Sequence, residues 1–257
     1  MRGRIGNVLR MEWAGMARTP SSLLFLVIIP LLLIGQAILL SWVLPRFVNP
    51  ELIGVGVPGG DGLDPTDAFR LLILGQFQFF VLLVPAMIAN VFATLSVVEE
   101  KTQGTLEPLL ATPVRTWELL LGKILSGALP ALLVAWACTG LFLALASLLG
   151  WSPLFPYVLT ATWYIALFLL MPAVSLLSFV VGVIGSSRAR DAKGAQNLAV
   201  VVVLPIFALI VVQVTGVIWF TALSTAVLAF VLGVVNALLL RVAVRLFVRE
   251  SIVIRWR

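Results

Sequence analysis

The sequence predicts an all-α polytopic membrane protein with six transmembrane helices, and three observations support this fold class. Composition is the first, because 61% of the 257 residues are hydrophobic and only 11% are charged, whereas soluble domains carry about 25% charged residues. The second is a series of uncharged apolar runs that suit transmembrane helices, which need about 20 residues each. The third is that basic residues gather in alternate connections. Together these features predict helices packed in a bilayer.

The apolar runs predict six spans within a single transmembrane domain, residues 1–257. The longest uncharged segment, residues 198–240, has 43 residues, and as one helix it would extend about 65 Å, twice the hydrocarbon thickness of a bilayer. It must therefore fold back, and residues 213–216 are its polar, glycine-containing interruption. The expected spans lie at about 21–44, 69–98, 117–149, 154–184, 198–213 and 219–240.

Loop charges predict the orientation of these spans. Fifteen of the 17 basic residues fall on the side that holds both termini, whereas Arg46 and Arg70 fall on the other side. Cytoplasmic loops carry an excess of Lys and Arg, so both termini are expected in the cytoplasm. The opposite face then has one connection of moderate length, about 45–68, and two tight turns.

Residues 1–19 place apolar side chains at helical spacing between arginines. This pattern predicts an amphipathic helix in the cytoplasmic membrane interface. A basic tail that only directs topology is the alternative interpretation.

The sequence lacks the residues on which several kinds of catalysis and transport depend. There is no histidine, which excludes His-based catalysis and His metal sites. All eleven acids lie in loops or near the ends of the expected spans, which argues against a proton-coupled pump and an intramembrane aspartyl protease, since both need ionisable groups inside the membrane. Gly122 and Lys123 lack the upstream glycine of a P-loop. We therefore expect no catalytic, cofactor-binding or metal-binding residue in this chain. The excess of basic over acidic residues indicates the orientation of the protein in the membrane rather than nucleic-acid binding.

Apart from Arg70, Glu118 and Lys123 near the span ends, the polar residues within the spans are uncharged. Hydrogen bonding between helices is their favoured role, and lining a transport pathway is the alternative. The candidates for either role are Gln36, Gln76, Gln78, Asn90 and Asn236. Prolines in the middle of five spans are each expected to kink or loosen a helix: Pro30, Pro85, Pro130, Pro172 and Pro205.

The connection between the second and third spans, about 99–116, is charged and interrupted. Residues 99–101, Glu-Glu-Lys, extend the second span into the cytoplasm, and Gly104 ends that helix. Thr105 is a good N-cap for a new helix, and Pro113 ends it, because a residue before proline avoids the α region. We expect a short cytoplasmic helix between these two residues.

Leu106, Leu109 and Leu110 share one face of this short helix. So short a helix is not stable alone in water, so its leucines must pack on something. A helix that lies on a membrane is usually basic, whereas residues 99–107 hold three acids and one lysine. A separate protein subunit is therefore favoured over the membrane surface or the ends of the chain's own helices.

The stretch EEKTQGTLEPLLATPVRTWELLLGK, residues 99–123, resembles a motif of the type-2 ATP-binding cassette (ABC) transporter permeases. That motif runs roughly E-[KR]-x-x-G-T-L-E-x-L-L-x-T-P, and the next helix opens with E-x-[LI]-x-[GA]-K. The layout of basic N-terminus, six spans and cytoplasmic termini is also similar. The matching positions are Glu100, Lys101, Gly104, Thr105, Leu106, Glu107, Leu109, Leu110, Thr112, Pro113, Glu118, Gly122 and Lys123.

The resemblance implies a permease subunit whose short helix is a coupling helix that sits in a cleft of a cytosolic ABC ATPase. It implies two permease subunits, with a homodimer favoured over a heterodimer, and two ATPases that bind ATP and magnesium. The pathway would lie between the permeases, in the plasma membrane of a prokaryote. The residues expected at the ATPase interface are Glu99, Glu100, Lys101, Gly104, Thr105, Leu106, Glu107, Leu109, Leu110, Thr112 and Pro113.

The expected function is export of a lipid-like, amphipathic drug-like or peptide cargo, because the polar residues away from the span ends are uncharged. Three alternatives remain: an ATP-independent secondary transporter or channel, a membrane-embedded enzyme or assembly factor, and an ABC permease for metalloenzyme or cofactor maturation. The connection between spans five and six, about 213–221, is shorter than in many members of the family.

Overall fold

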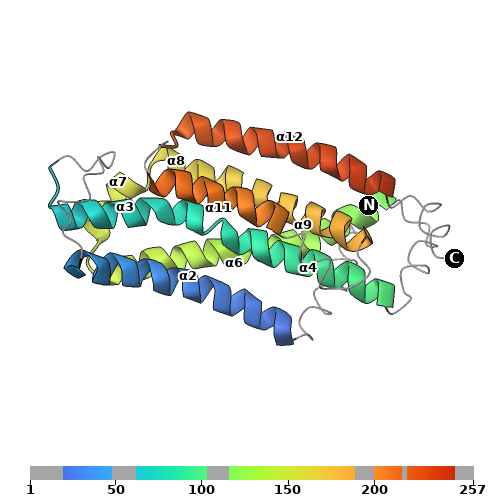
Figure 1. The fold of residues 1–257 in the computed structure, drawn as a ribbon, viewed down its shortest axis with the longest axis horizontal. Helices are drawn as coiled ribbons and strands as arrows, with labels where there is room; N and C mark the ends of the chain where they lie inside the picture. Colours follow the sequence, from blue (N-terminus) through green and yellow to red (C-terminus); the bar gives the residue numbers. More distant parts are fainter. Residues whose placement is uncertain (1–19, 48–61, 103–115, 189–199, 216–218, 247–257) are drawn as a thin grey trace.

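A computed structural model describes residues 20–47, 62–102, 116–188, 200–215 and 219–246. These residues form helices that run side by side along the long axis of the molecule (Figure 1), and this part of the chain contains no strand. The expected interfacial helix at 1–19 and most of the connection at 45–68 lie outside the described residues. In chain order the helices are α2 (Pro20–Phe47), α3 (Pro65–Phe80), α4 (Leu83–Thr102), α6 (Thr116–Leu148), η2 (Ser152–Leu154), α7 (Phe155–Val158), α8 (Ala161–Ile165), η3 (Ala166–Leu170), α9 (Met171–Arg188), α11 (Val200–Val214) and α12 (Ala222–Leu246).

Five helical segments of the described chain are long and apolar enough to cross a membrane. A sixth apolar helix, α11, is shorter, and its 15 residues rise about 22 Å, against a hydrocarbon core of about 30 Å. A crossing by α11, and with it the expected total of six spans, stays a prediction. The five segments are Val27–Phe47, Pro65–Ala93, Leu121–Leu148, Ala161–Ser186 and Ala222–Val244.

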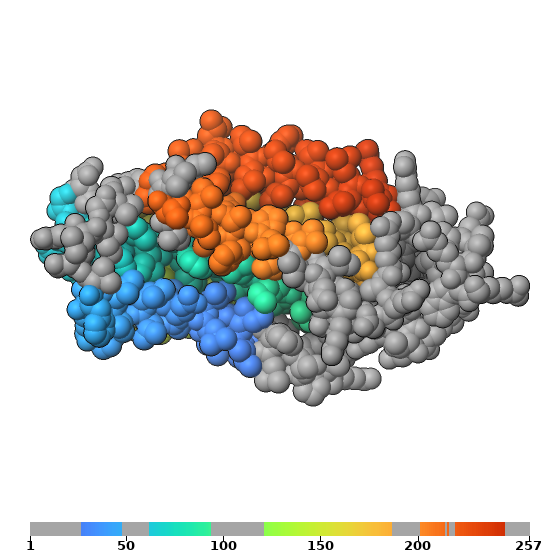
Figure 2. Space-filling model, viewed as in Figure 1, coloured from blue at the N-terminus to red at the C-terminus, as the bar shows by residue number. Residues whose placement is uncertain are grey.

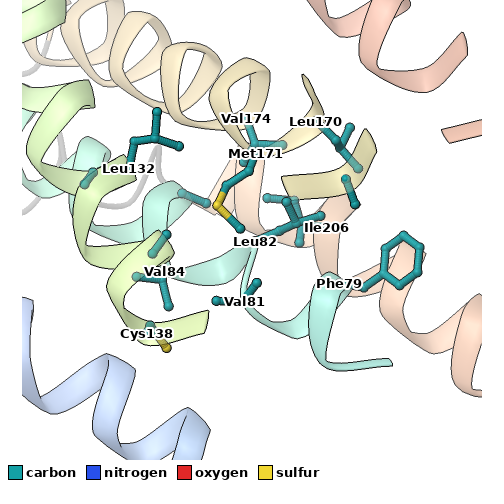
Figure 3. Packing of buried hydrophobic residues seen from close by; sticks show 14 of the residues in the cluster. Phe79, Val81, Leu82, Val84, Leu132, Cys138, Leu170, Met171, Val174 and Ile206 are labelled. Carbon is teal, nitrogen blue, oxygen red and sulfur yellow. The ribbon is translucent and has the colours of Figure 1, made fainter. Parts of the chain in front are cut away.

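The helices divide into a buried centre and an apolar periphery. α4 packs against α9 and α6, and together with α3 these helices supply most of the buried apolar core. Figure 3 shows part of that core, where Leu82 and Val84 lie near Met171 and Val174. By contrast, α2 and α12 lie along opposite margins of the molecule (Figure 2) and expose large apolar side chains, as expected for surfaces that face lipid.

Glycine allows α4 and α9 to approach each other closely within this centre. A Cβ atom built at Gly182 on α9 would lie 2.7 Å from the Cβ of Ala93 on α4. Small residues at such crossings let membrane helices approach closely enough for van der Waals packing to hold them together.

Pro85 explains why the second expected span is two helices. Proline has no N–H to donate to the carbonyl four residues earlier, here that of Val81. The chain tightens instead, and the N–H of Val84 donates to the Val81 carbonyl at 3.1 Å. α3 therefore ends at Phe80 and α4 begins at Leu83.

The fourth membrane helix begins later than the expected start near residue 154. Pro153 and Pro156 stand in the first turns of the short helices η2 and α7, where a missing N–H costs nothing. Thr160 then adopts an extended conformation, with φ −83° and ψ 170°, and α8 starts directly after it. The segment before Ala161 thus covers the end of the bundle rather than crossing it.

Candidate functional site

The α4–α6 connection is the expected point of contact with an ATPase. Residues 99–101 lie in the last turns of α4, which continues without a break to Thr102, and α6 starts at Thr116. α4 and α6 pack on each other, and both reach the connection at the same end of the bundle (Figure 1). The other expected interface residues lie outside the described residues: Gly104, Thr105, Leu106, Glu107, Leu109, Leu110, Thr112 and Pro113.

Lys123 lies two turns into α6, near the same end of the bundle, and is only 3% exposed. It takes part in an interaction within the protein, as a buried ammonium group must. Sequence reasoning matched this lysine to the permease motif but did not assign it to the site. The available signal was a lysine inside an otherwise uncharged apolar run.

Asn236 and Asn90, two of the five intramembrane polar candidates, differ in whether the side chain makes a hydrogen bond. Asn236 on α12 donates its Nδ2 to the carbonyl of Ala173 on α9 at 2.8 Å, whereas its Oδ1 is buried without a hydrogen-bond partner. Asn90 on α4 is 1% exposed, and neither polar atom of its side chain has a hydrogen-bond partner. It contacts the α4–α9 crossing, where a Cβ at Gly182 would lie 3.3 Å from its Nδ2.

Gln36 does not belong with the other candidates. It lies on α2, at an exposed position beside a small apolar cavity of about 30 Å³ between α2 and α3. That space is about enough for a water molecule. Nothing in the described part of the chain connects Gln36 with the buried glutamines of α3.

Gln76 and Gln78 do come together, at a cavity of about 350 Å³. The cavity lies at the end of the bundle opposite the α4–α6 connection, where α3, α7 and α8 meet the turn between α11 and α12 (Figure 1). Its polar lining consists of Gln76, Gln78, Tyr157, Thr160, Thr162, Gln213, Trp219 and Thr221.

Hydrogen bonds fix the turn that closes one side of this cavity. The Oε1 of Gln213 accepts from the Phe220 N–H at 3.2 Å, and Gln76 Nε2 donates to the Gln213 carbonyl at 3.4 Å. Thr221 and Ser224 cap α12 reciprocally, because each backbone N–H donates to the other residue's hydroxyl, at 2.8 and 3.3 Å. Such reciprocal capping satisfies two donors at a helix start.

Among the described residues, the cavity lining carries no charge. None of its residues is Asp, Glu, Lys or Arg, and Arg70, next to the lining residue Leu71, pairs with Asp67 at 2.9 Å. The Oε1 atoms of Gln76 and Gln78 are buried without a hydrogen-bond partner. Because these two atoms have almost no accessible surface, they do not face the cavity.

Sequence reasoning missed most of this site. It treated Gln213 only as the polar interruption of residues 198–240, and it did not select Tyr157, Thr160 or Trp219. The signal for Gln213 was present, because it is a lone amide at the end of an apolar run. The short helices that bring the threonines to the cavity gave no such signal.

Comparison with known proteins gives the family. A family model for ABC-2 family transporter proteins matches residues 7–229, which include both the α4–α6 connection and the cavity. The chain is also similar to the "Probable multidrug ABC transporter permease YbhR" of Escherichia coli strains K12 and O157:H7, with 40% identity over 67 residues in each case. That similarity covers 23% of this chain and only 17% of each relative's length. Because the family match extends over most of the sequence, the chain belongs to the ABC-2 family of transporter proteins.

Proposed function

We propose that this chain is the membrane-spanning permease subunit of an ABC exporter in a prokaryotic plasma membrane. The observation that carries the proposal is the family match over residues 7–229. The helical bundle supports it, because five segments can each cross a bilayer. The functional unit would contain two permeases, identical in the favoured arrangement, and two cytosolic ABC ATPases that supply the ATP and magnesium sites.

The proposed topology has six crossings, with α11 as the fifth in chain order and both termini in the cytoplasm. α11 packs against α3, α4 and α9 within the bundle (Figure 1), rather than lying across one end of it. Gln213, near the end of α11, and residues 219–222, at the start of α12, line the cavity. The excess of basic residues on the side of the termini supports the orientation.

Energy would enter through the α4–α6 connection. In this mechanism, ATP closes the two ATPases, and a coupling helix between Thr105 and Pro113 transmits the movement to α4 and α6. α4 would pass it to α9, its most extensively packed neighbour. ATP can shift the permease between inward-facing and outward-facing states only if the ATPases bind the two states with different affinity.

The proposed cargo is amphipathic: lipid-like, drug-like or a peptide. The buried polar side chains of the intramembrane candidates are amides, which can accompany a partly polar molecule but cannot neutralise a bare ion. The relatives named as probable multidrug permeases agree with a drug-like cargo. We propose that this cargo moves outward, from the cytoplasm.

The test of this function is coupling to the ATPase. Leu109→Asp places a charge on the expected docking face and should abolish co-purification of the ATPase and its stimulation by the permease, while membrane insertion is unchanged. Leu148→Asp is the matched control, because Leu148 is 84% exposed at the opposite end of α6. If Leu109→Asp leaves co-purification and stimulated ATP hydrolysis as in the wild type, the coupling-helix assignment is wrong.

A further inference from the structure

The C-terminal end of α2 carries an arginine that pairs with no carboxylate of the described chain. We propose that Arg46 and Trp42, with the exposed face of α2 that leads to them, bind one anionic phospholipid of the surrounding bilayer through its phosphodiester group. This lipid is a resident of the protein's margin and not its cargo, because α2 lies along the edge of the bundle (Figure 2). Its binding does not depend on export, and only its assignment to the outer leaflet rests on the proposed orientation.

The first argument is the contact between the two side chains. The guanidinium carbon of Arg46 lies 3.9 Å from the centroid of the Trp42 ring, which stands one turn earlier on the same face of the helix. Both side chains are exposed. A guanidinium that rests on an aromatic ring keeps N–H groups at its edge for oxygen acceptors. Trp42 therefore holds the charge of Arg46 on the surface of the bundle, where an anion can reach it.

The second argument is a comparison with Arg70, the other arginine at this end of the bundle. Arg70 donates its Nη1 to the Oδ1 of Asp67 at 2.9 Å, so its charge is matched within the protein. Arg46 has no such partner among the described residues. Its charge is left for an anion outside that part of the chain, and the phosphates of lipid headgroups surround every helix end that reaches the bilayer surface.

The third argument is depth. The membrane segment of α2, Val27–Phe47, has 21 residues and rises about 31 Å, close to the hydrocarbon thickness of about 30 Å. Arg46 is the last residue but one of this segment, so its guanidinium reaches the boundary between acyl chains and headgroups. Tryptophan is enriched at that boundary, and arginines near helix ends extend towards it.

The fourth argument is the order of side chains along the exposed face of α2. Five exposed residues follow each other at spacings of three or four: Leu32, Gly35, Leu39, Trp42 and Arg46. At these spacings they share one face of the helix. Nothing lies within 4 Å of a Cβ atom built at Gly35, which leaves room for an acyl chain. The face thus passes from apolar through aromatic to cationic, as a phospholipid passes from acyl chain through glycerol to phosphate.

A lipid with net negative charge fits this face better than a zwitterionic lipid or a free anion. A phosphodiester presents two oxygens to the fork of a guanidinium. In phosphatidylglycerol no ammonium group competes for those oxygens, whereas in phosphatidylethanolamine one does. A free phosphate would leave the apolar part of the face uncovered, including Leu39, which is 59% exposed.

The test is native mass spectrometry of the full chain in a mild detergent, with phosphatidylglycerol added in steps and no ATPase present. The wild type should bind one lipid more tightly than any others. Arg46→Gln should raise the apparent dissociation constant of that lipid about tenfold, the effect of losing a hydrogen bond to a charged group. Arg70→Gln is the matched control, because Arg70 is already paired, and it should bind the lipid as the wild type does.

Two further variants separate loss of the site from loss of the fold. Arg46→Lys keeps the charge and should recover part of the affinity that Arg46→Gln loses, which a folding defect would not allow. Trp42→Ala keeps the arginine but removes the ring that positions it, and it too should weaken binding. Equal affinities of the Arg46→Gln and Arg70→Gln variants would overturn the proposal.

Other ligands and a cross-link identify the occupant. Dioleoylglycerol lacks the phosphate, glycerol 3-phosphate lacks the acyl chains, and phosphatidylethanolamine adds an ammonium group; each should bind more weakly than phosphatidylglycerol. Equal affinity for any of the three would overturn the assignment to an anionic phospholipid. Disulfide cross-linking between two Leu39→Cys chains in the membrane would place a second copy on this face and would overturn it as well. The native Cys138 is buried and should not contribute to such a cross-link.

Discussion

Trp136 on α6 donates its indole N–H to the carbonyl of Leu167 at 3.1 Å, and Pro172 explains why that carbonyl is free. η3 is π-helical, with the N–H of Met171 bonded to the carbonyl of Ala166 five residues earlier. The next bond of this pattern would run from residue 172 to Leu167, but proline has no N–H to donate. The neighbouring helix therefore supplies the missing donor.

Trp136→Phe should destabilise the bundle by about 1 kcal/mol, because it leaves the partly buried Leu167 carbonyl without this donor. The measurement is thermal or chemical unfolding in detergent. Trp42→Phe is the control, because Trp42 lies on an exposed face of α2, and its effect should be small.

The sharper version of this test is a double-mutant cycle with Pro172→Ala. An alanine restores an N–H at position 172 that can reach the Leu167 carbonyl, so Trp136→Phe should cost less in that background than in the wild type. Such a coupling of neighbouring sites is what the cycle measures. Additive effects of the two substitutions would contradict the explanation.

Gly182→Ala should destabilise the α4–α9 crossing. The new Cβ would lie 2.7 Å from the Cβ of Ala93, and overpacking of this kind costs about 1–3 kcal/mol. Gly140→Ala on α6 is the matched control, since nothing lies within 4 Å of the position that its Cβ would take; there the higher helix propensity of alanine should make the change neutral or stabilising. Equal unfolding temperatures for the two variants would show that α4 and α9 can separate without cost.

Asn90→Leu and Asn236→Leu should change stability in opposite directions. The Asn90 amide is buried without a partner, so its replacement by a similar apolar side chain removes a desolvation cost and should be neutral or stabilising. Asn236 bonds to the Ala173 carbonyl, and its loss should cost about 0.5–1.5 kcal/mol. Unfolding of the two variants in the same detergent decides the point, and destabilisation by Asn90→Leu would indicate a hydrogen bond that this conformation lacks.

Local patterns predicted the helices but not which residues meet. The break between α11 and α12 lies near residues 213–216 because lipid-facing helices cannot exceed the bilayer, a constraint visible in hydropathy alone. The meeting of Gln76 with Gln213 joins residues 137 positions apart, and no periodicity encodes that distance. Gln36 looked equivalent to Gln76 in the sequence, since both are lone amides in apolar runs. Only packing distinguishes them, because α3 is central and α2 is peripheral.

Glu100→Ala should lower transport more than it lowers expression, if residues 99–101 serve the proposed ATPase interface. Glu100 lies in the last turns of α4, beyond the apolar run that ends at Val98, so folding in the bilayer should not need its charge. Asp64→Ala is the matched control at the other end of the bundle, because Asp64 is exposed and its side chain makes no capping bond to α3. Transport of a fluorescent amphiphile into inverted vesicles, divided by the amount of folded permease, gives the comparison. Parallel losses of transport and folded protein in Glu100→Ala would assign this carboxylate to folding, because a coupling role affects only the movement that ATP drives.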